Sequence, residues 1–271
     1  IIDNVRTLLS LYYNNFEVII VNDGSTDDTF SKIRDAYELV RVNYYFDYRI
    51  PCERIRGVYR SKDPAYNRLT VIDKNNGGKA DSLNAGINIS RSDLIVTIDA
   101  DSIIEPDSIL KLVKPFLEEK DKKVIGTGGV IRIVNSCDVE RGHIRQINLP
   151  KKFLPRVQVL DYTRAFLLGR MAWSHLDGLM LISGAMGMFD RETVIRAGGY
   201  SIKTEQVDGL PKGVRASVAV RAPASNGDLP VSVYGTRVSV DVAGLLKLRP
   251  NLLWAGQAHG SANGWVVLEV R

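Results

Sequence analysis

The sequence predicts an α/β fold with a mostly parallel sheet flanked by helices. Apolar runs of strand length alternate with stretches whose apolar residues recur every three to four positions, which is typical of parallel strands joined by helices. Two runs, 18–21 and 94–98, are continuously aliphatic or β-branched and lead directly into Asp23 and Asp99. Strands buried on both faces have this pattern, and ligands of open α/β sheets bind at the carboxyl ends of such strands.

The expected elements of the first half follow from these periodicities. Two of the helices have start signals: Ser25 is followed three positions later by Asp28, and Pro106 follows Glu105. We expect, in order, a helix at 2–11, a strand at 17–21, a helix at 29–39, a polar aromatic-rich stretch at 44–60, a strand at 70–73, a helix at 79–89, a strand at 94–98 and a helix at 106–120.

The next segment is less regular. Residues 124–134, which contain three glycines, predict a strand pair or a bulged strand. A helix is expected at 158–173. The mostly apolar stretch 178–189 has two interpretations, either plain core or the wall of a groove for an acceptor.

The chain changes character after Gly198-Gly199-Tyr200. From about Glu205 it is rich in Val, Ala, Gly, Ser and Arg, and strand-like alternation returns only at 231–242. We therefore divide the chain into a first domain, 1–204, and an atypical C-terminal tail, 205–271.

Composition argues against several classes of protein. The net charge of +5 is mild, and the basic residues are scattered apart from Lys151-Lys152 with Arg156, so a dedicated nucleic-acid binder is not expected. Cys52 and Cys137 lie far apart without metal-ligand spacing, which argues against a disulfide framework or a zinc site. No run reaches the roughly 18 apolar residues that a membrane-spanning helix needs. The chain opens inside a helical pattern without a signal peptide, so we expect a fragment that begins partway through a domain.

The first acidic turn, 23–28, follows a strand and opens a helix. It allows two interpretations. In one, a serine or threonine hydroxyl caps the helix; in the other, Asp23 accepts hydrogen bonds from a nucleotide base or ribose. Asp27 and Asp28 are better explained as first-turn acids favoured by the helix dipole.

A glycine-rich turn, 73–80, also follows a strand, and it enters a helix whose amide end suits a phosphate. It is not an ATPase-type phosphate loop. That loop needs a glycine five positions before its Gly-Lys pair and a serine or threonine after it, where this chain has Asp73 and Ala80. Lys79 is suited to neutralising a pyrophosphate, although a surface lysine at a glycine-rich turn is the simpler interpretation of this segment alone.

The second acidic turn is Asp99-Ala100-Asp101. Alternate residues of a strand point the same way, so Asp99 and Asp101 can present two carboxylates to one cation. Hard oxygen ligands suit Mg²⁺ or Mn²⁺ bridging to a pyrophosphate. A calcium-binding EF-hand is excluded, because it requires an oxygen donor and a glycine where the chain has Ile103 and Ile104. A pair of solvated turn acids is the alternative.

Taken together and in this order, the segments resemble the inverting family-2 glycosyltransferases, especially the membrane-anchored branch of cellulose, hyaluronan and poly-N-acetylglucosamine synthases. The ordered motifs are Val-Asn-Asp-Gly-Ser, Asn-Gly-Gly-Lys-Ala-x-x-Leu-Asn, Asp-Ala-Asp, Ser-Gly-Ala and Gly-Gly-Tyr. The resemblance extends from the first residues to about Thr204. It implies a GT-A type, Rossmann-like domain that uses Mg²⁺ or Mn²⁺ and a UDP-sugar donor.

The resemblance also implies a role for each segment. Asp23 would contact the uracil, Lys79 the nucleotide, Asp99 the nucleotide side of the donor, and Asp101 the metal. The acceptor site would be lined by Ser183, Gly184 and Ala185. The acceptor would be a polysaccharide or a lipid-linked sugar, and the intact protein would work at the cytoplasmic face of the cell membrane, attached through segments absent from this chain.

The general base that takes the proton of the acceptor hydroxyl is missing from its expected place. In this family it is the aspartate of a Glu-Asp or similar pair shortly after Gly-Gly-Tyr, and residues 201–208 contain no such pair. Asp208 is a candidate substitute, but 209–211 predicts a turn where the family has a helix. The Gln-x-x-Arg-Trp segment of processive members and the opening strand with its Pro-x-Tyr-Asn-Glu type turn are also absent.

Because the resemblance stops abruptly, we hypothesise that the tail is not family sequence and arose by a reading-frame slip or a fusion. We expect such a chain to bind donor poorly and to turn over little or nothing. Two alternatives stay open. One is a soluble, nonprocessive glycosyltransferase that adds one sugar to a lipid or protein acceptor, and the other is a degenerate nucleotide-sugar-binding module without catalysis.

Overall fold

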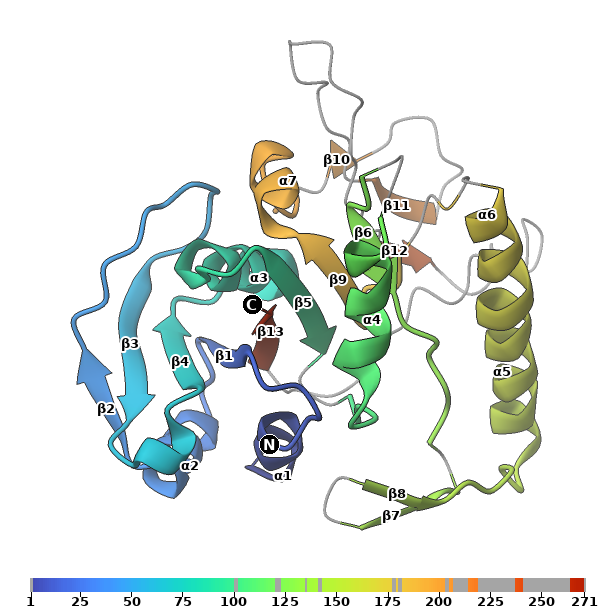
Figure 1. Cartoon of the computed structure of the whole chain (residues 1–271), viewed down its shortest axis with the longest axis horizontal. Helices are drawn as coiled ribbons and strands as arrows, with labels where there is room; N and C mark the ends of the chain where they lie inside the picture. The colour runs from blue at the N-terminus through green and yellow to red at the C-terminus, as the bar shows by residue number, and fades with distance from the viewer. Residues whose placement is uncertain are drawn as a thin grey trace.

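An eight-stranded sheet in the order β2-β3-β4-β1-β13-β5-β9-β6 forms the centre of the computed structural model, with helices on both of its faces (Figure 1). Two predicted site residues, Asp101 and Asp208, lie outside the residues that the structure describes. The described residues are 2–99, 102–119, 123–134, 136–140, 143–176, 179, 182–202, 205–206, 214–218, 237–240 and 264–270.

Helices and strands alternate along the chain, and a three-stranded and a two-stranded sheet accompany the large one. In order, the elements are α1 (Ile2–Leu9), β1 (Phe16–Asp23), α2 (Thr29–Ala36), β2 (Leu39–Val42), β3 (Ile55–Ser61), η1 (Pro64–Tyr66), β4 (Leu69–Lys74), α3 (Gly78–Ile89), β5 (Leu94–Asp99), α4 (Ser108–Leu117), β6 (Gly126–Gly128), β7 (Asp138–Glu140), β8 (His143–Gln146), α5 (Phe153–Thr163), η2 (Arg164–Arg170), α6 (Met171–His175), β9 (Met186–Asp190), α7 (Arg191–Arg196), β10 (Glu205–Gln206), β11 (Val214–Val218), β12 (Arg237–Val240) and β13 (Gly264–Val270).

The α/β fold class is confirmed, but the sheet is less parallel than expected. Strands β1 and β4 pair in parallel, and β5 runs the same way because β1 and β5 are both antiparallel to β13. The outer pairs β2–β3, β3–β4, β5–β9 and β6–β9 are antiparallel. The connections within β2–β3–β4 contain no α-helix to carry the chain back across the sheet, so these neighbours pair as hairpins do.

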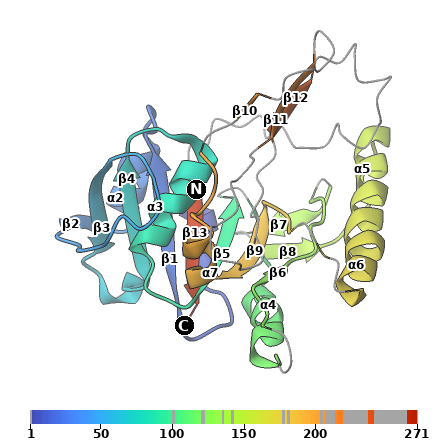
Figure 2. The same cartoon turned by 90° about the horizontal axis from the view of Figure 1, so that it is seen from above.

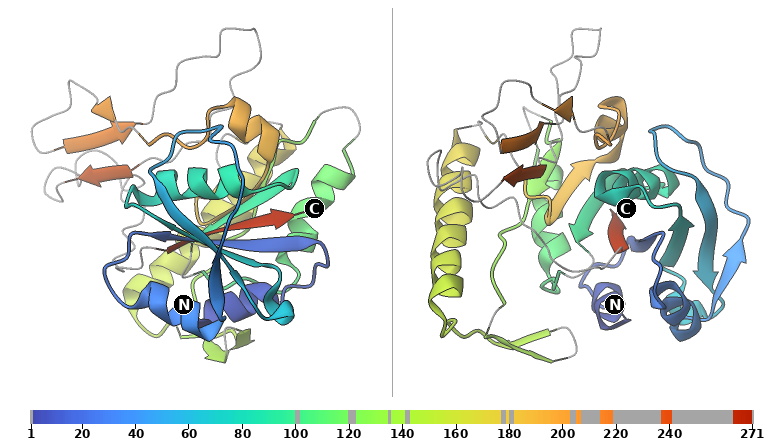
Figure 3. Two further views of the ribbon diagram at one scale, coloured as in Figure 1. Left: turned by 90° about the vertical axis from the view of Figure 1, so that its left-hand side faces the viewer. Right: turned by 180° about the vertical axis from the view of Figure 1, so that it is seen from behind.

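The end of the tail lies inside the large sheet. Strand β13 pairs antiparallel with β1 along its whole length, from Gly264 opposite Asn22 to Val270 opposite Phe16, and on its other edge with β5 (Figure 3, left). Without β13, the edges of β1 and β5 that it covers would have no strand partner. The structure therefore connects part of 205–271 to the first domain, whereas the origin of the tail stays a hypothesis.

The core has one layer on each face of the sheet. Strand β1 illustrates the arrangement, since Val18 and Ile20 belong to one buried cluster while Ile19 and Val21 belong to the other. The first cluster contains residues of α1, α2 and α4, and the second contains residues of α3 and α7. This two-sided burial explains why the central strands are continuously apolar in sequence.

Several element boundaries differ from the predictions. The helix predicted at 29–39 ends at Ala36, because Glu38 turns the chain with φ 46° and Leu39 already belongs to β2. The polar aromatic-rich stretch at 44–60, to which no strand was assigned, contains most of β3. The strand pair or bulged strand predicted at 124–134 is one short strand, β6. The helix predicted at 158–173 is longer, from Phe153 to His175, because α5, the π-helix η2 and α6 follow one another without a break.

A proline substitution at the centre of β13 tests the position of this strand between β1 and β5. Val267→Pro would remove an N–H from a strand paired on both sides, so we expect an unpaired carbonyl in the sheet and a melting temperature lower by roughly 5–10 °C. Val267→Thr, which keeps the N–H and the β-branch, is the matched control. Circular dichroism on heating measures both, and equal melting temperatures for Val267→Pro and the wild type would contradict the central position of β13.

Candidate functional site

Three strands that run in the same direction end in charged residues at one edge of the sheet. Asp23 ends β1, Lys74 ends β4 and Asp99 ends β5. Helix α3 begins at Gly78, just after β4, so its amino-terminal end lies at the same edge. This is the edge at which ligands of open α/β sheets bind.

The Asp23 carboxylate organises the start of α3. It is buried and accepts hydrogen bonds from the backbone N–H groups of Gly77 (2.9 Å) and Gly78 (2.8 Å). Its backbone carbonyl accepts a bond from the side chain of Asn76. Gly24, with φ +66°, passes so close to this turn that a Cβ there would lie 2.9 Å from the Asn76 nitrogen. The structure thus gives Asp23 a structural role, and its predicted contact with uracil stays a prediction.

A buried ion-pair cluster underlies this turn. The Lys74 ammonium lies 2.6 Å from Asp23 Oδ1 and 2.5 Å from Asp81 Oδ1, and all three side chains are buried. It also donates to the carbonyl of Asn75. Two carboxylates share one cation, and the N–H groups that bind Asp23 balance part of the remaining negative charge. Removing one partner of such a buried group typically costs about 3–5 kcal/mol, because the other charges stay desolvated.

Lys79 brings the predicted donor and acceptor segments together. Its ammonium forms an ion pair with Asp99 and donates a hydrogen bond to the carbonyl of Gly184 (2.9 Å). The Asp99 N–H bonds the carbonyl of Ala185, whose own N–H bonds the Ser183 hydroxyl. Four predicted site residues from two other segments, Asp99 and 183–185, therefore lie around one partly exposed lysine, whose neighbouring turn is fixed by Asp23.

The described residues fit a divalent cation only in part. Asp99 provides one partly exposed carboxylate, and no group of three His, Cys, Asp or Glu side chains in the described ranges could hold a metal by itself. Mg²⁺ bound with a diphosphate needs only one or two carboxylates, since phosphate and water oxygens complete its octahedron. These residues therefore suit a cation that is held mainly by the oxygens of a bound diphosphate, with the Asp99 carboxylate as a ligand from the protein.

One face of α3 carries polar residues that the sequence analysis did not assign. Asp81, Asn84 and Asn88, spaced by three and four residues, are buried on the helix. The Asn88 amide oxygen accepts from the N–H groups of Arg49 and Ile50 and its amide nitrogen donates to the Ile50 carbonyl, so it holds the connection between β2 and β3. The spacing on a predicted helix was the available signal.

Asn84 ties the Gly-Gly-Tyr segment to the same helix. Its amide oxygen accepts from the Tyr200 N–H (2.7 Å), and its nitrogen donates to the carbonyls of Tyr200 and Pro51. Gly199 lies so close, with φ +73°, that a Cβ would come within 2.6 Å of the Asn84 oxygen. Burial raises the pKa of Tyr200 to about 12, and its hydroxyl lies 3.3 Å from that of Thr97. The segment that should lead to the base is thus fixed beside α3.

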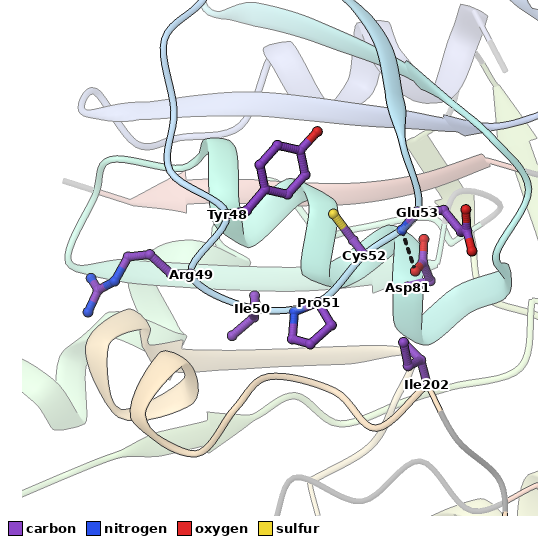
Figure 4. Close-up of a pocket in the computed structure, with 8 residues that line it drawn as sticks. All are labelled: Tyr48, Arg49, Ile50, Pro51, Cys52, Glu53, Asp81 and Ile202. Atoms are coloured by element: carbon purple, nitrogen blue, oxygen red, sulfur yellow. Dashed lines mark hydrogen bonds between the residues drawn. The ribbon is translucent and has the colours of Figure 1, made fainter.

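A hollow of about 330 Å³ lies beside this face of α3 (Figure 4). Figure 4 shows the Glu53 N–H bonded to the Asp81 carboxylate at one end of it, with Ile202 below. Neither Lys79 nor Asp99 contributes to its walls, so it is separate from the predicted donor site. Its lining residues are Tyr48, Arg49, Ile50, Pro51, Cys52, Glu53, Asp81 and Ile202.

Comparisons of the sequence with a family profile and with curated proteins agree with each other. The glycosyl transferase family 2 profile matches residues 1–50 and 53–178. The poly-β-1,6-N-acetyl-D-glucosamine synthase of Staphylococcus aureus is 25% identical over 197 residues, which cover 72% of this chain and 37% of the synthase. The synthase of the same name from Staphylococcus epidermidis is 25% identical over 198 residues, covering 73% and 38%. The chain thus spans little more than a third of the length of these curated relatives.

Removing the Asp23 carboxylate tests its structural role. Asp23→Ala would leave Lys74 with one carboxylate and the Gly77 and Gly78 N–H groups without acceptors, so we expect a loss of about 3–5 kcal/mol in the free energy of unfolding. Asp28→Ala, which removes an exposed carboxylate paired with Lys32, should cost less than about 1 kcal/mol. Urea denaturation measures both, and equal costs would contradict the assignment.

Proposed function

The chain belongs to glycosyl transferase family 2, and we propose that it represents the part of a synthase that transfers a sugar from a UDP-sugar to a growing polysaccharide with inversion at the anomeric carbon. The family and the likeness to a polymer synthase support sugar transfer. The single observation that supports the site is the position of Lys79, between Asp99 at the end of β5 and the carbonyl of Gly184.

Donor binding is assigned to the edge formed by β1, β5 and the start of α3. The amino-terminal end of α3 favours an anion, and Lys79 in its first turn adds a full positive charge. In this proposal the diphosphate takes the place of Asp99 as partner of the Lys79 ammonium. Asp101 as a metal ligand and Asp23 as a uracil contact are part of the same proposal and rest on the sequence motifs.

The reaction would move the anomeric carbon from the diphosphate oxygen to an acceptor hydroxyl, whose proton passes to a base. Lys79 would stabilise the charge that develops on the departing diphosphate. A bound Mg²⁺ or Mn²⁺ would supply further positive charge to the same oxygens. Ser183, Gly184 and Ala185 would form the wall toward the acceptor, because Gly184 and Ala185 contact Lys79 and Asp99 directly.

We further propose that this chain binds the UDP-sugar donor poorly and transfers little or no sugar. The Glu-Asp pair of the family is absent after Gly-Gly-Tyr, and the substitute candidate Asp208 has no support beyond its position in the sequence. This absence favours a second candidate function, a nucleotide-sugar-binding module without catalysis. For the intact protein we propose a place at the cytoplasmic face of the membrane and a polysaccharide or lipid-linked acceptor.

Replacing Lys79 tests the donor site. Lys79→Met should weaken binding of UDP in the presence of Mn²⁺ by about 10- to 100-fold, because it removes a charged hydrogen-bond donor to the diphosphate. Its side chain is partly exposed, so the melting temperature should change little. Lys111→Met, which removes an exposed lysine on α4, is the matched control.

Isothermal titration calorimetry with UDP and Mn²⁺ measures binding, and release of UDP from UDP-N-acetylglucosamine measures turnover. Binding that depends on Lys79 together with turnover supports the transferase. Binding that depends on Lys79 without turnover supports the module. Binding that Lys79→Met leaves unchanged would contradict the proposed donor site.

A further inference from the structure

The connection between β2 and β3, residues 43–54, is fixed along much of its length. Figure 2 shows these two strands on the side of the molecule opposite to α5 and α6. Three buried side chains of α3 bind the backbone of the connection: Asn88 at residues 49 and 50, Asn84 at residue 51 and Asp81 at residue 53. Buried polar contacts of this kind hold an irregular segment in one shape. The hollow beside the connection is therefore preformed.

This hollow combines an aromatic ring with aliphatic side chains (Figure 4). Tyr48 is 56% exposed, and the Phe46 ring packs against it with 4.9 Å between the ring centroids. Pro51 and Ile202 add aliphatic surface. The volume of about 330 Å³ is at the lower end of the range for small-molecule sites. The hollow therefore suits a small ligand that has an apolar face.

The charged groups of the hollow favour a neutral ligand. The Arg49 guanidinium donates two 2.8 Å hydrogen bonds to Glu192 of α7, and the Asp81 carboxylate pairs with the buried Lys74. Within the described part of the chain, the Glu53 carboxylate has no hydrogen-bond or ion-pair partner, so it can accept bonds from a ligand. An anion would face the carboxylates of Glu53 and Asp81, and a cation would face Arg49. A neutral ligand rich in hydroxyl groups avoids both conflicts.

We propose that this hollow binds a pyranose unit of a neutral saccharide chain, with the C–H face of the sugar on Tyr48 and its hydroxyl groups at Glu53 and Arg49. A pyranose has C–H groups on its faces, which pack on an aromatic ring, and hydroxyl groups around its rim. Hydroxyl groups both donate and accept, so they can donate to the Glu53 carboxylate and accept from Arg49. A guanidinium has five N–H groups, and the two bonds from Arg49 to Glu192 leave others for the sugar.

The site would hold a saccharide chain beside the reaction centre. Asp81 in its wall lies in the first turn of α3, two residues after Lys79. Neither Lys79 nor the segment 183–185 lines the hollow, so the site is additional to the proposed donor and acceptor sites. A chain bound here would have a raised effective concentration near the transfer site. That consequence rests on the proposed function, whereas binding of the saccharide does not.

Saturation-transfer difference NMR of the full chain with cellotetraose, and separately with chitotetraose, tests the proposal. We expect a dissociation constant on the order of 1 mM for at least one of them, because the hollow is small. Tyr48→Ala and Glu53→Ala should each weaken binding roughly tenfold, whereas Tyr48→Phe, which keeps the ring, should bind within about twofold of the wild type. The matched control is Tyr12→Ala, which removes a 67% exposed tyrosine between α1 and β1 and should bind as the wild type does.

Alkylation of the two cysteines gives a second readout that needs no variant. Cys52 lines the hollow and Cys137 does not, and both are partly buried. A saturating tetrasaccharide should slow the reaction of Cys52 with iodoacetamide at least about threefold and leave that of Cys137 unchanged, as peptide mass mapping measures.

The variant Lys79→Met separates this site from the proposed donor site. It should weaken UDP binding and leave both saccharide readouts unchanged, so failure of one site can be told from failure of the other. Three results would overturn the saccharide site. These are no binding of either tetrasaccharide at about 10 mM, binding that Tyr48→Ala leaves unchanged, and equal protection of Cys52 and Cys137.

Discussion

The ion-pair cluster of Lys74 with Asp23 and Asp81 is the interaction on which the functional edge depends. A buried ammonium must be paired, and its two partners come from different elements, the end of β1 and the first turn of α3. Pairing therefore fixes the end of β1, the end of β4 and the start of α3 relative to one another. Lys79, one residue into that helix, reaches Asp99 and Gly184 from a position that this cluster determines.

A second set of polar contacts extends this order across α3. Asn84 and Asn88 satisfy backbone groups of two irregular segments, the connection after β2 and the Gly-Gly-Tyr segment, which lack partners within regular structure. Amide side chains suit the task because each both donates and accepts. Helix α3 thus has two roles. At its start, the Gly77 and Gly78 N–H groups bind Asp23, and Lys79 lies at the ligand edge; along its buried polar face, the helix holds two irregular segments.

The central sheet and the helical segment 153–175 differ in how far their apolar side chains are covered. At the centre of the sheet, β13 covers the edges of β1 and β5, and both faces are buried by helices. On the helical segment 153–175, several apolar side chains are exposed. A sheet edge demands backbone partners from a neighbouring strand, whereas a helix satisfies its own backbone and leaves only its side chains to find a partner.

The sequence by itself determined the α/β class, the strands β1, β4 and β5 with the helices between them, and the position of Asp23, Lys79 and Asp99 at one edge of the sheet, because buried strands and their terminal carboxylates leave a local pattern. Tertiary structure alone decided three things. These are the central antiparallel position of β13, the burial of Asn84 and Asn88, and the engagement of Asp23 with Gly77, Gly78 and Lys74. Each of these depends on contacts between residues far apart in the chain, and local periodicity carries no information about which distant partner will satisfy a strand edge, an amide or a carboxylate.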